Sequence, residues 1–134
     1  MSEEPAGAAR PAGDVYDWYQ RGMSLLRTGH PAAAAALLEH AVVAEPGSRS
    51  VRELLARAQY AAGSYERARD NFEAIISDAP ADDYAHFGLG LTLMRTNDLS
   101  GATEHLALAA AMRPDNRDYG LALRRARAVR AAAS

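Results

Sequence analysis

Residues 15–48 read VYDWYQRGMSLLRTGHPAAAAALLEHAVVAEPGS, and this stretch decides the fold because its pattern returns twice without insertion or deletion. Three prolines mark the period, since Pro46, Pro80 and Pro114 stand 34 residues apart. A period of this size is typical of solenoid proteins, in which each repeat is one small unit stacked on the next. The sequence therefore predicts three repeats, at residues 15–48, 49–82 and 83–116.

Small and large side chains recur at fixed positions, which we count from the first residue of each repeat. Positions 8 and 20 are small in every copy, and position 24 is large and apolar. The residues are Gly22, Ala56 and Gly90 at position 8, Ala34, Ala68 and Ala102 at position 20, and Leu38, Phe72 and Leu106 at position 24. Small residues let two helices approach closely, and large apolar residues fill the space beside them. This pattern predicts a pair of packed helices in each repeat.

Each repeat also has a break near its middle, at Gly29, Gly63 and Asn97. Glycine and asparagine are the residues that a helix end uses for a left-handed conformation, and the prolines end the second helix of each pair. The expected helices span residues 15–28, 32–44, 49–62, 65–78, 83–96 and 99–112. The predicted fold class is therefore all-α, without strands.

The pattern resembles the tetratricopeptide repeat, a family of helix–turn–helix solenoids. The first repeat matches that family at Trp18, Gly22, Ala34, Leu38, Ala41 and Pro46. The other two repeats match at positions 8, 20, 24 and 32 but depart at position 4, where Arg52 and His86 stand, and the second has Ile75 in place of alanine. The resemblance covers residues 15–116 and implies a right-handed α-α superhelix, with seven antiparallel helices once the segment after the repeats is included.

The two flanking segments differ in character. Residues 117–134 are expected to form a C-terminal capping helix, because one apolar stripe runs along them at helical spacing. Its members are Tyr119, Ala122, Leu123, Ala126 and Val129. Residues 1–14 are rich in proline, glycine and alanine and lack an apolar pattern, so we expect a disordered N-terminal tail.

Composition excludes several classes of function. The chain carries 15 basic and 17 acidic residues, a net charge of −2, whereas a general nucleic-acid binder would show a basic face. No apolar run approaches the roughly 20 residues of a membrane span, so neither nucleic acid nor membrane is expected as a partner. Glu3 and Glu4 stand where a signal peptide would be basic, which favours a cytoplasmic location. The excess of alanine and arginine favours a bacterial source.

We find no pattern that indicates catalysis. The chain has no cysteine, and its four histidines (His30, His40, His86 and His105) include no pair four residues apart on one expected helix. A metal site would need histidines brought together by the tertiary structure, and surface or partly buried histidines are the simpler interpretation. We therefore expect no enzyme activity, no catalytic or metal-binding residues and no cofactor.

In the family that the chain resembles, the first helices of the repeats line a concave groove where ligands bind. The resemblance implies that positions 2, 5, 9, 12 and 13 face that groove. The candidate partner-binding residues at these positions are Tyr16, Tyr19, Met23 and Arg27 in the first repeat, Glu53, Arg57 and Tyr60 in the second, Tyr84, Phe87, Leu91, Met94 and Arg95 in the third, and Arg125 in the capping helix. Aromatic, methionine and arginine side chains are enriched at interface centres.

Two alternatives remain for these residues. Tyr19, Phe87 and Leu91 could instead pack on neighbouring first helices, and the arginines could form a solvated face. The carboxylate clamp with which some family members hold chaperone tails needs lysine at position 5 and asparagine at position 9 of the first repeat. Tyr19 and Met23 stand there, so chaperone-tail capture is disfavoured.

The sequence thus predicts a non-catalytic scaffold that binds a protein or peptide segment with apolar and some acidic side chains. The alternative hypothesis is a self-associating, homo-oligomeric protein whose groove takes its own chain or another copy. Neither the partner nor its pathway follows from the fold, since one fold serves many functions.

Overall fold

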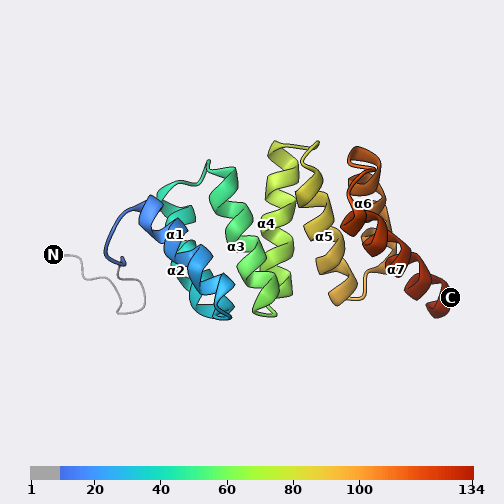
Figure 1. The fold of residues 1–134 in the computed structure, drawn as a ribbon, viewed down its shortest axis with the longest axis horizontal. Helices are drawn as coiled ribbons and strands as arrows, with labels where there is room; N and C mark the ends of the chain where they lie inside the picture. The colour runs from blue at the N-terminus through green and yellow to red at the C-terminus, as the bar shows by residue number, and fades with distance from the viewer. Residues whose placement is uncertain (1–9) are drawn as a thin grey trace.

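The structure, a computed structural model, describes residues 10–134, and these residues form seven helices and no strand. The helices are α1 (Val15–Arg27), α2 (Pro31–Ala44), α3 (Arg49–Ala61), α4 (Tyr65–Asp78), α5 (Asp83–Arg95), α6 (Leu99–Met112) and α7 (Arg117–Ala133). Figure 1 shows them stacked in one row from α1 to α7, so that helices adjacent in sequence are adjacent in space. Among the helices of residues 10–134, none combines the length and the apolar character that crossing a membrane requires.

Local sequence explains where the helices begin and end. Five helices start after a side chain that accepts a hydrogen bond from the backbone N–H three residues on, which satisfies a donor without a partner inside the helix. These caps are Asp14, Ser48, Asp82, Asp98 and Asn116. The first helix of each pair ends before a left-handed residue, with φ of 85° at Gly29, 81° at Gly63 and 64° at Asn97. The expected helices are confirmed, with bounds that differ by at most one residue.

Glycines at position 8 allow the two helices of a pair to touch. A Cβ atom at Gly22 would lie 2.8 Å from the side chain of Leu38, and one at Gly90 would lie 2.5 Å from that of Leu106. Carbon atoms that are not bonded separate to about 3.5–4.0 Å, so any larger residue would force the helices apart. Leu38 and Leu106 are fully buried at these contacts.

Position 4 makes the same connection in all three repeats although its residue changes. Each side chain donates a hydrogen bond to the backbone carbonyl six residues earlier. The pairs are Trp18 Nε1 with Ala12 at 3.1 Å, Arg52 Nη2 with Pro46 at 3.3 Å, and His86 Nε2 with Pro80 at 2.8 Å. The departures from the family pattern at Arg52 and His86 therefore leave this link between the first helix and the preceding loop in place.

The N-terminal segment is tied to α1 from Arg10 onward. The guanidinium of Arg10 lies 5.1 Å from the centre of the Trp18 ring, and the carbonyl of Ala12 also accepts a hydrogen bond from Arg21. Residues 10–14 belong to the segment expected to be a tail. They contact α1 because the indole N–H of the buried Trp18 finds its acceptor there. Residues 1–9 of that expected tail lie outside the described residues.

Helix α7 packs on α6 through part of its apolar stripe. Tyr119, Leu123 and Ala126 are buried, and the last two contact Leu106 of α6. Val129, which was expected in the same stripe, is 45 % exposed. The next residue, Arg130, makes the contact with α6 at this turn, where it donates a hydrogen bond to Thr103.

Candidate partner-binding surface

The odd-numbered helices form the inner side of the row. Helix α1 contacts α3, α3 contacts α5 and α5 contacts α7, whereas α2, α4 and α6 make no such contacts with one another within residues 10–134. A row of helix pairs bends towards the side on which its helices are closest together. The odd-numbered helices therefore line the concave face.

A pocket of about 320 Å³ opens between α1, α3 and α5. Apolar side chains supply most of its walls, with Arg57 and two tyrosine hydroxyls as the polar groups. The lining residues are Leu26 of α1, Arg57, Tyr60 and Ala61 of α3, Phe72 of α4, and Tyr84, Gly88 and Leu91 of α5. Ligand sites range from about 300 to 1,000 Å³, so this volume suits one or two side chains of a partner.

Gly88 brings the ring of Phe72 to the pocket. A Cβ atom at Gly88 would lie 2.4 Å from that ring, so the absence of a side chain lets Phe72 lie directly against the backbone of α5. Phe72 is otherwise buried in the central core with Ala68 and Ile75. The pocket is therefore continuous with a packed core and is held in shape by it.

Arg57 supplies the positive charge of the pocket. It is exposed, and no carboxylate lies within ion-pair distance of it among the described residues. Burial raises the pKa of Tyr84, so this half-buried hydroxyl keeps its proton. Burial also raises the pKa of Glu53, and the neighbouring Asp82 carboxylate adds to this effect. Arg57 lowers the pKa of both groups, so its charge acts on this whole corner of the groove.

Arg95 is already engaged within the chain. Its guanidinium lies 5.9 Å from the ring centre of Tyr60 and 5.7 Å from that of Tyr65, and its Nε donates to the Tyr60 hydroxyl at 3.4 Å. The two tyrosine rings meet edge to face at 5.5 Å. Arg95 thus braces Tyr60, while Arg57 remains available to a ligand.

The other candidate residues divide into packed and exposed groups. Phe87, Leu91 and Met94 pack against the cluster of Leu106, Leu123 and Ala126, and the Phe87 ring lies 4.7 Å from that of Tyr119. Tyr19 and Met23 pack on the cluster that joins α2 to α3. Tyr16, Arg27 and Arg125 are exposed and do not line the pocket. Packing, the alternative interpretation, therefore describes Tyr19 and Phe87, whereas Leu91 both packs and lines the pocket.

Four lining residues were not among the candidate residues from sequence: Leu26, Ala61, Phe72 and Gly88. Leu26 and Ala61 stand at positions 12 and 13, which the resemblance does place in the groove. Position 24 was assigned to the core, and only the three-dimensional structure shows that Phe72 also reaches the groove. Gly88 lies inside α5, two residues before Gly90. The signal that could have identified it is an additional glycine, two residues before the expected glycine of the repeat.

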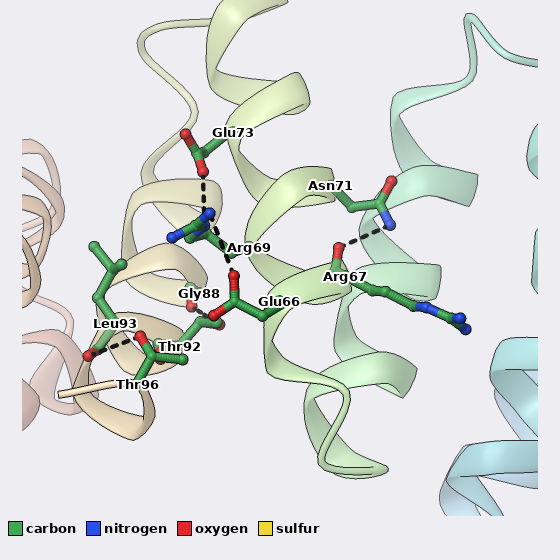
Figure 2. A network of polar contacts seen from close by, with 9 residues as sticks. All are labelled: Glu66, Arg67, Arg69, Asn71, Glu73, Gly88, Thr92, Leu93 and Thr96. Carbon is green, nitrogen blue, oxygen red and sulfur yellow. Dashed lines mark hydrogen bonds and ion pairs between the residues drawn. The ribbon is translucent and has the colours of Figure 1, made fainter. Parts of the chain in front are cut away.

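The outer face carries the charges of the second helices. Figure 2 shows Arg69 of α4 between Glu66 and Glu73, at N–O distances of 3.3 and 3.2 Å. All three side chains are at least 40 % exposed, and exposed ion pairs of this kind contribute about 0–1 kcal/mol. This face is therefore a solvated surface and provides control positions for experiments on the groove.

Two histidines, which were expected to be surface or partly buried residues, are in contact within the structure. His86 of α5 and His105 of α6 approach to 3.0 Å between their Nδ1 atoms. Within residues 10–134, no group of three or more metal-ligating side chains is placed to hold an ion. Sequence reasoning missed this pair because its members are 19 residues apart, on two different helices.

Comparison with known proteins is consistent with this architecture. A family model described as tetratricopeptide repeat matches residues 19–76 and 53–117. No curated protein sequence matches the chain. Among solved structures, MamA from Desulfovibrio magneticus RS-1 is 22 % identical with a TM-score of 0.82, and the match covers 87 % of this chain but only 66 % of that one.

Two further solved structures match this chain over most of the length of both proteins. The first tetratricopeptide repeat domain of Spaghetti (RPAP3), bound to the HSP90 peptide SRMEEVD, is 16 % identical with a TM-score of 0.81. The match covers 90 % of this chain and 94 % of that one. The Sgt2 domain from Aspergillus fumigatus is 19 % identical with a TM-score of 0.82, covering 98 % and 87 %. At these identities, the likeness is one of fold.

Proposed function

Because this chain belongs to the tetratricopeptide repeat family, we propose that it is a non-catalytic scaffold whose concave face binds a segment of another protein. The observation that carries the proposal is the pocket between α1, α3 and α5. Its walls are mostly apolar, and Arg57 is the one charged residue among those that line it. A pocket of this kind takes a large apolar side chain and leaves a cation at the rim for a second contact.

The partner segment should therefore combine an apolar residue with a nearby aspartate or glutamate. Burial of a leucine-sized side chain contributes about 1.5–3 kcal/mol, and the planar guanidinium of Arg57 can bind a carboxylate through two parallel hydrogen bonds. The RPAP3 domain holds a peptide that contains both kinds of residue. This chain lacks the lysine and asparagine of the chaperone clamp, so we propose a different partner sequence.

The test begins with selection of binding peptides from a random display library, using the full chain as target. We expect the selected peptides to share an apolar residue next to an acidic one, and to shift the backbone NMR signals of Leu26, Ala61, Gly88 and Leu91. Arg57→Gln should weaken the strongest peptide roughly fivefold, as expected for a partly exposed ion pair. Alanine at the apolar peptide position should weaken it roughly tenfold.

Arg67→Gln is the matched control, because Arg67 is an exposed arginine on α4, where it pairs with Glu39 at 3.6 Å. This variant should bind the peptides as the unchanged protein does. If the NMR shifts fall on α4 and α6 and Arg57→Gln has no effect, the groove hypothesis is wrong. A stable dimer in light scattering that Arg57→Gln dissociates would instead assign the groove to self-association.

A further inference from the structure

The contact between His86 and His105 has a defined hydrogen-bond geometry. Their rings stack with centres 5.2 Å apart and planes inclined by 20°, and their Nδ1 atoms are 3.0 Å apart. His86 is 4 % exposed, and its Nε2 lies 2.8 Å from the carbonyl oxygen of Pro80. The pair therefore joins α5, α6 and the loop between α4 and α5.

One arrangement of protons satisfies all these contacts. A carbonyl oxygen can only accept, so His86 must carry its hydrogen on Nε2. In the neutral ring Nδ1 is then an acceptor, and His105 must donate its own Nδ1–H to it. Both rings are thus fixed in one tautomer each, with Nε2–H on His86 and Nδ1–H on His105.

Protonation disturbs this arrangement in two steps. A first proton on Nε2 of His105 preserves the hydrogen bond but places a charge on a partly buried ring. A second proton, on Nδ1 of His86, would set two N–H groups and two positive charges against each other at 3.0 Å. Full protonation is therefore incompatible with the contact.

The charges around the pair act in both directions. Burial lowers the pKa of His105, and His86 on α5 lowers it further. Glu104 and Asp98 on the side of α6 and Glu73 of α4 raise it, but the lowering prevails. Helix α7 contacts α6 at Thr103, two residues before His105, where Arg130 donates a hydrogen bond to the Thr103 hydroxyl at 3.3 Å. The folded chain therefore binds a proton at this site less readily than the unfolded chain.

The second repeat makes the same connection with groups that do not titrate near neutral pH. Arg52 occupies the place of His86 and Asn71 that of His105, and the Arg52 Nη1 donates to Asn71 Oδ1 at 2.9 Å. Arg52 also donates to the Pro46 carbonyl, as His86 does to that of Pro80. The histidine pair is therefore a titratable version of a link that the fold can make with other residues.

We propose that His86 and His105 form a proton-sensitive latch that holds α5 in place at neutral pH and releases it on acidification. Helix α5 supplies Tyr84, Gly88 and Leu91 to the pocket. Release of the latch therefore changes the pocket wall, which makes partner binding weaker at acid pH. This consequence rests on the proposed function, whereas the latch itself is tested without any partner.

NMR of the unchanged protein tests the geometry. Two-bond proton–nitrogen spectra at about pH 7.5 should show the Nε2–H tautomer for His86 and the Nδ1–H tautomer for His105. On lowering the pH to about 5, the signals of Tyr84, Gly88 and Leu91 should shift as the pair takes up its second proton, the step that breaks the contact. Other tautomers, or pocket signals that stay fixed once both rings are protonated, would overturn the latch.

Chemical unfolding tests the energetics, with the double variant His86→Arg/His105→Asn, which copies the second repeat into the third. Each proton that the unfolded chain binds and the folded chain excludes raises the unfolding constant by up to about tenfold per pH unit. Between about pH 7.5 and 5, the unfolding constant of the unchanged protein should rise at least about tenfold more than that of the double variant.

The single variant His105→Asn provides a second comparison, because an asparagine amide can still donate to Nδ1 of His86. It should show a pH dependence between those of the other two proteins. Equal pH dependence in all three proteins would refute the latch, whatever the outcome of the peptide-binding experiment.

Discussion

Trp18, Arg52 and His86 have little in common chemically, yet each donates a hydrogen bond to the carbonyl six residues before it. What position 4 requires is therefore an N–H donor of the right reach, and aromatic character is one way to provide it. The corresponding residue of α7 is Gly120, which has no side chain to make this bond. At this position the fold therefore depends on where one N–H donor lies, and the rest of the side chain can vary.

Gly90→Ala tests the close approach of α5 to α6. The new Cβ atom would lie 2.5 Å from Leu106 and 3.2 Å from the backbone oxygen of Ala102, and the backbone cannot yield easily. We expect a loss of about 1–3 kcal/mol in the free energy of unfolding, measured by urea denaturation.

Gly120→Ala is the control, since the nearest atom to its new Cβ would be a flexible Arg124 nitrogen at 3.6 Å. Alanine is the better helix former by about 0.5–1 kcal/mol, so this variant should be equally or more stable than the unchanged protein. If both glycines tolerate alanine, the two helices are farther apart than the structure places them.

At the scale of the helix, local signals made the boundaries predictable. Caps such as Asp82 and left-handed residues such as Gly63 act on their own helix, so the sequence around them is sufficient. Which face of a helix stays open depends on the neighbouring helices instead. Tyr16 and Phe87 both stand at expected groove positions, but Tyr16 is 69 % exposed whereas Phe87 packs on Tyr119. The pocket and the histidine pair could not be predicted for the same reason.

Tyr119→Phe tests how α7 is joined to α5. The Tyr119 hydroxyl donates to Asp83 Oδ2 at 2.7 Å, and hydrogen bonds to charged groups contribute about 1.5–3 kcal/mol. The variant should lose stability in that range while its ring still packs on Phe87. Tyr65→Phe is the control, because no hydrogen bond of the Tyr65 hydroxyl is present among the described residues, and it should change stability little.

The same variant makes a prediction at alkaline pH. Burial raises the pKa of Tyr119, and its hydrogen bond to Asp83 adds to this effect. The folded chain keeps this proton where the unfolded chain, with a pKa near 10, releases it, so stability falls as the pH rises above about 10. Tyr119→Phe should show a shallower fall in urea denaturation over that range. An identical fall in both proteins would mean that the hydroxyl is not held as described.

At the scale of the whole molecule, stability is carried by contacts between neighbours along the row. Helix α1 contacts α2 and α3, and α7 contacts α5 and α6, with no contact between the two ends of residues 10–134. In such a stack, a change at one end affects the next unit far more than a distant one. Charge is also uneven, because five arginines and one aspartate give residues 117–134 a net charge of +4, which leaves −6 for residues 1–116.

Deleting residues 117–134 should therefore uncover one end and leave the other unchanged. The deletion exposes Leu106, Phe87, Leu91 and Met94, which α7 covers, so we expect aggregation or a large loss of stability. In hydrogen exchange, the amides of α5 and α6 should lose protection while those of α1 and α2 keep it.

The truncated chain carries a larger net charge than the full chain, which by itself favours solubility, so aggregation would have to come from the exposed apolar surface. The full chain with Arg124→Glu and Arg125→Glu carries the same charge of −6 with α7 in place, and it should remain soluble and protected. If this variant aggregates as the truncated chain does, charge and not capping explains the effect, and equal protection of α5 and α6 in the truncated chain would remove the capping role of α7 altogether.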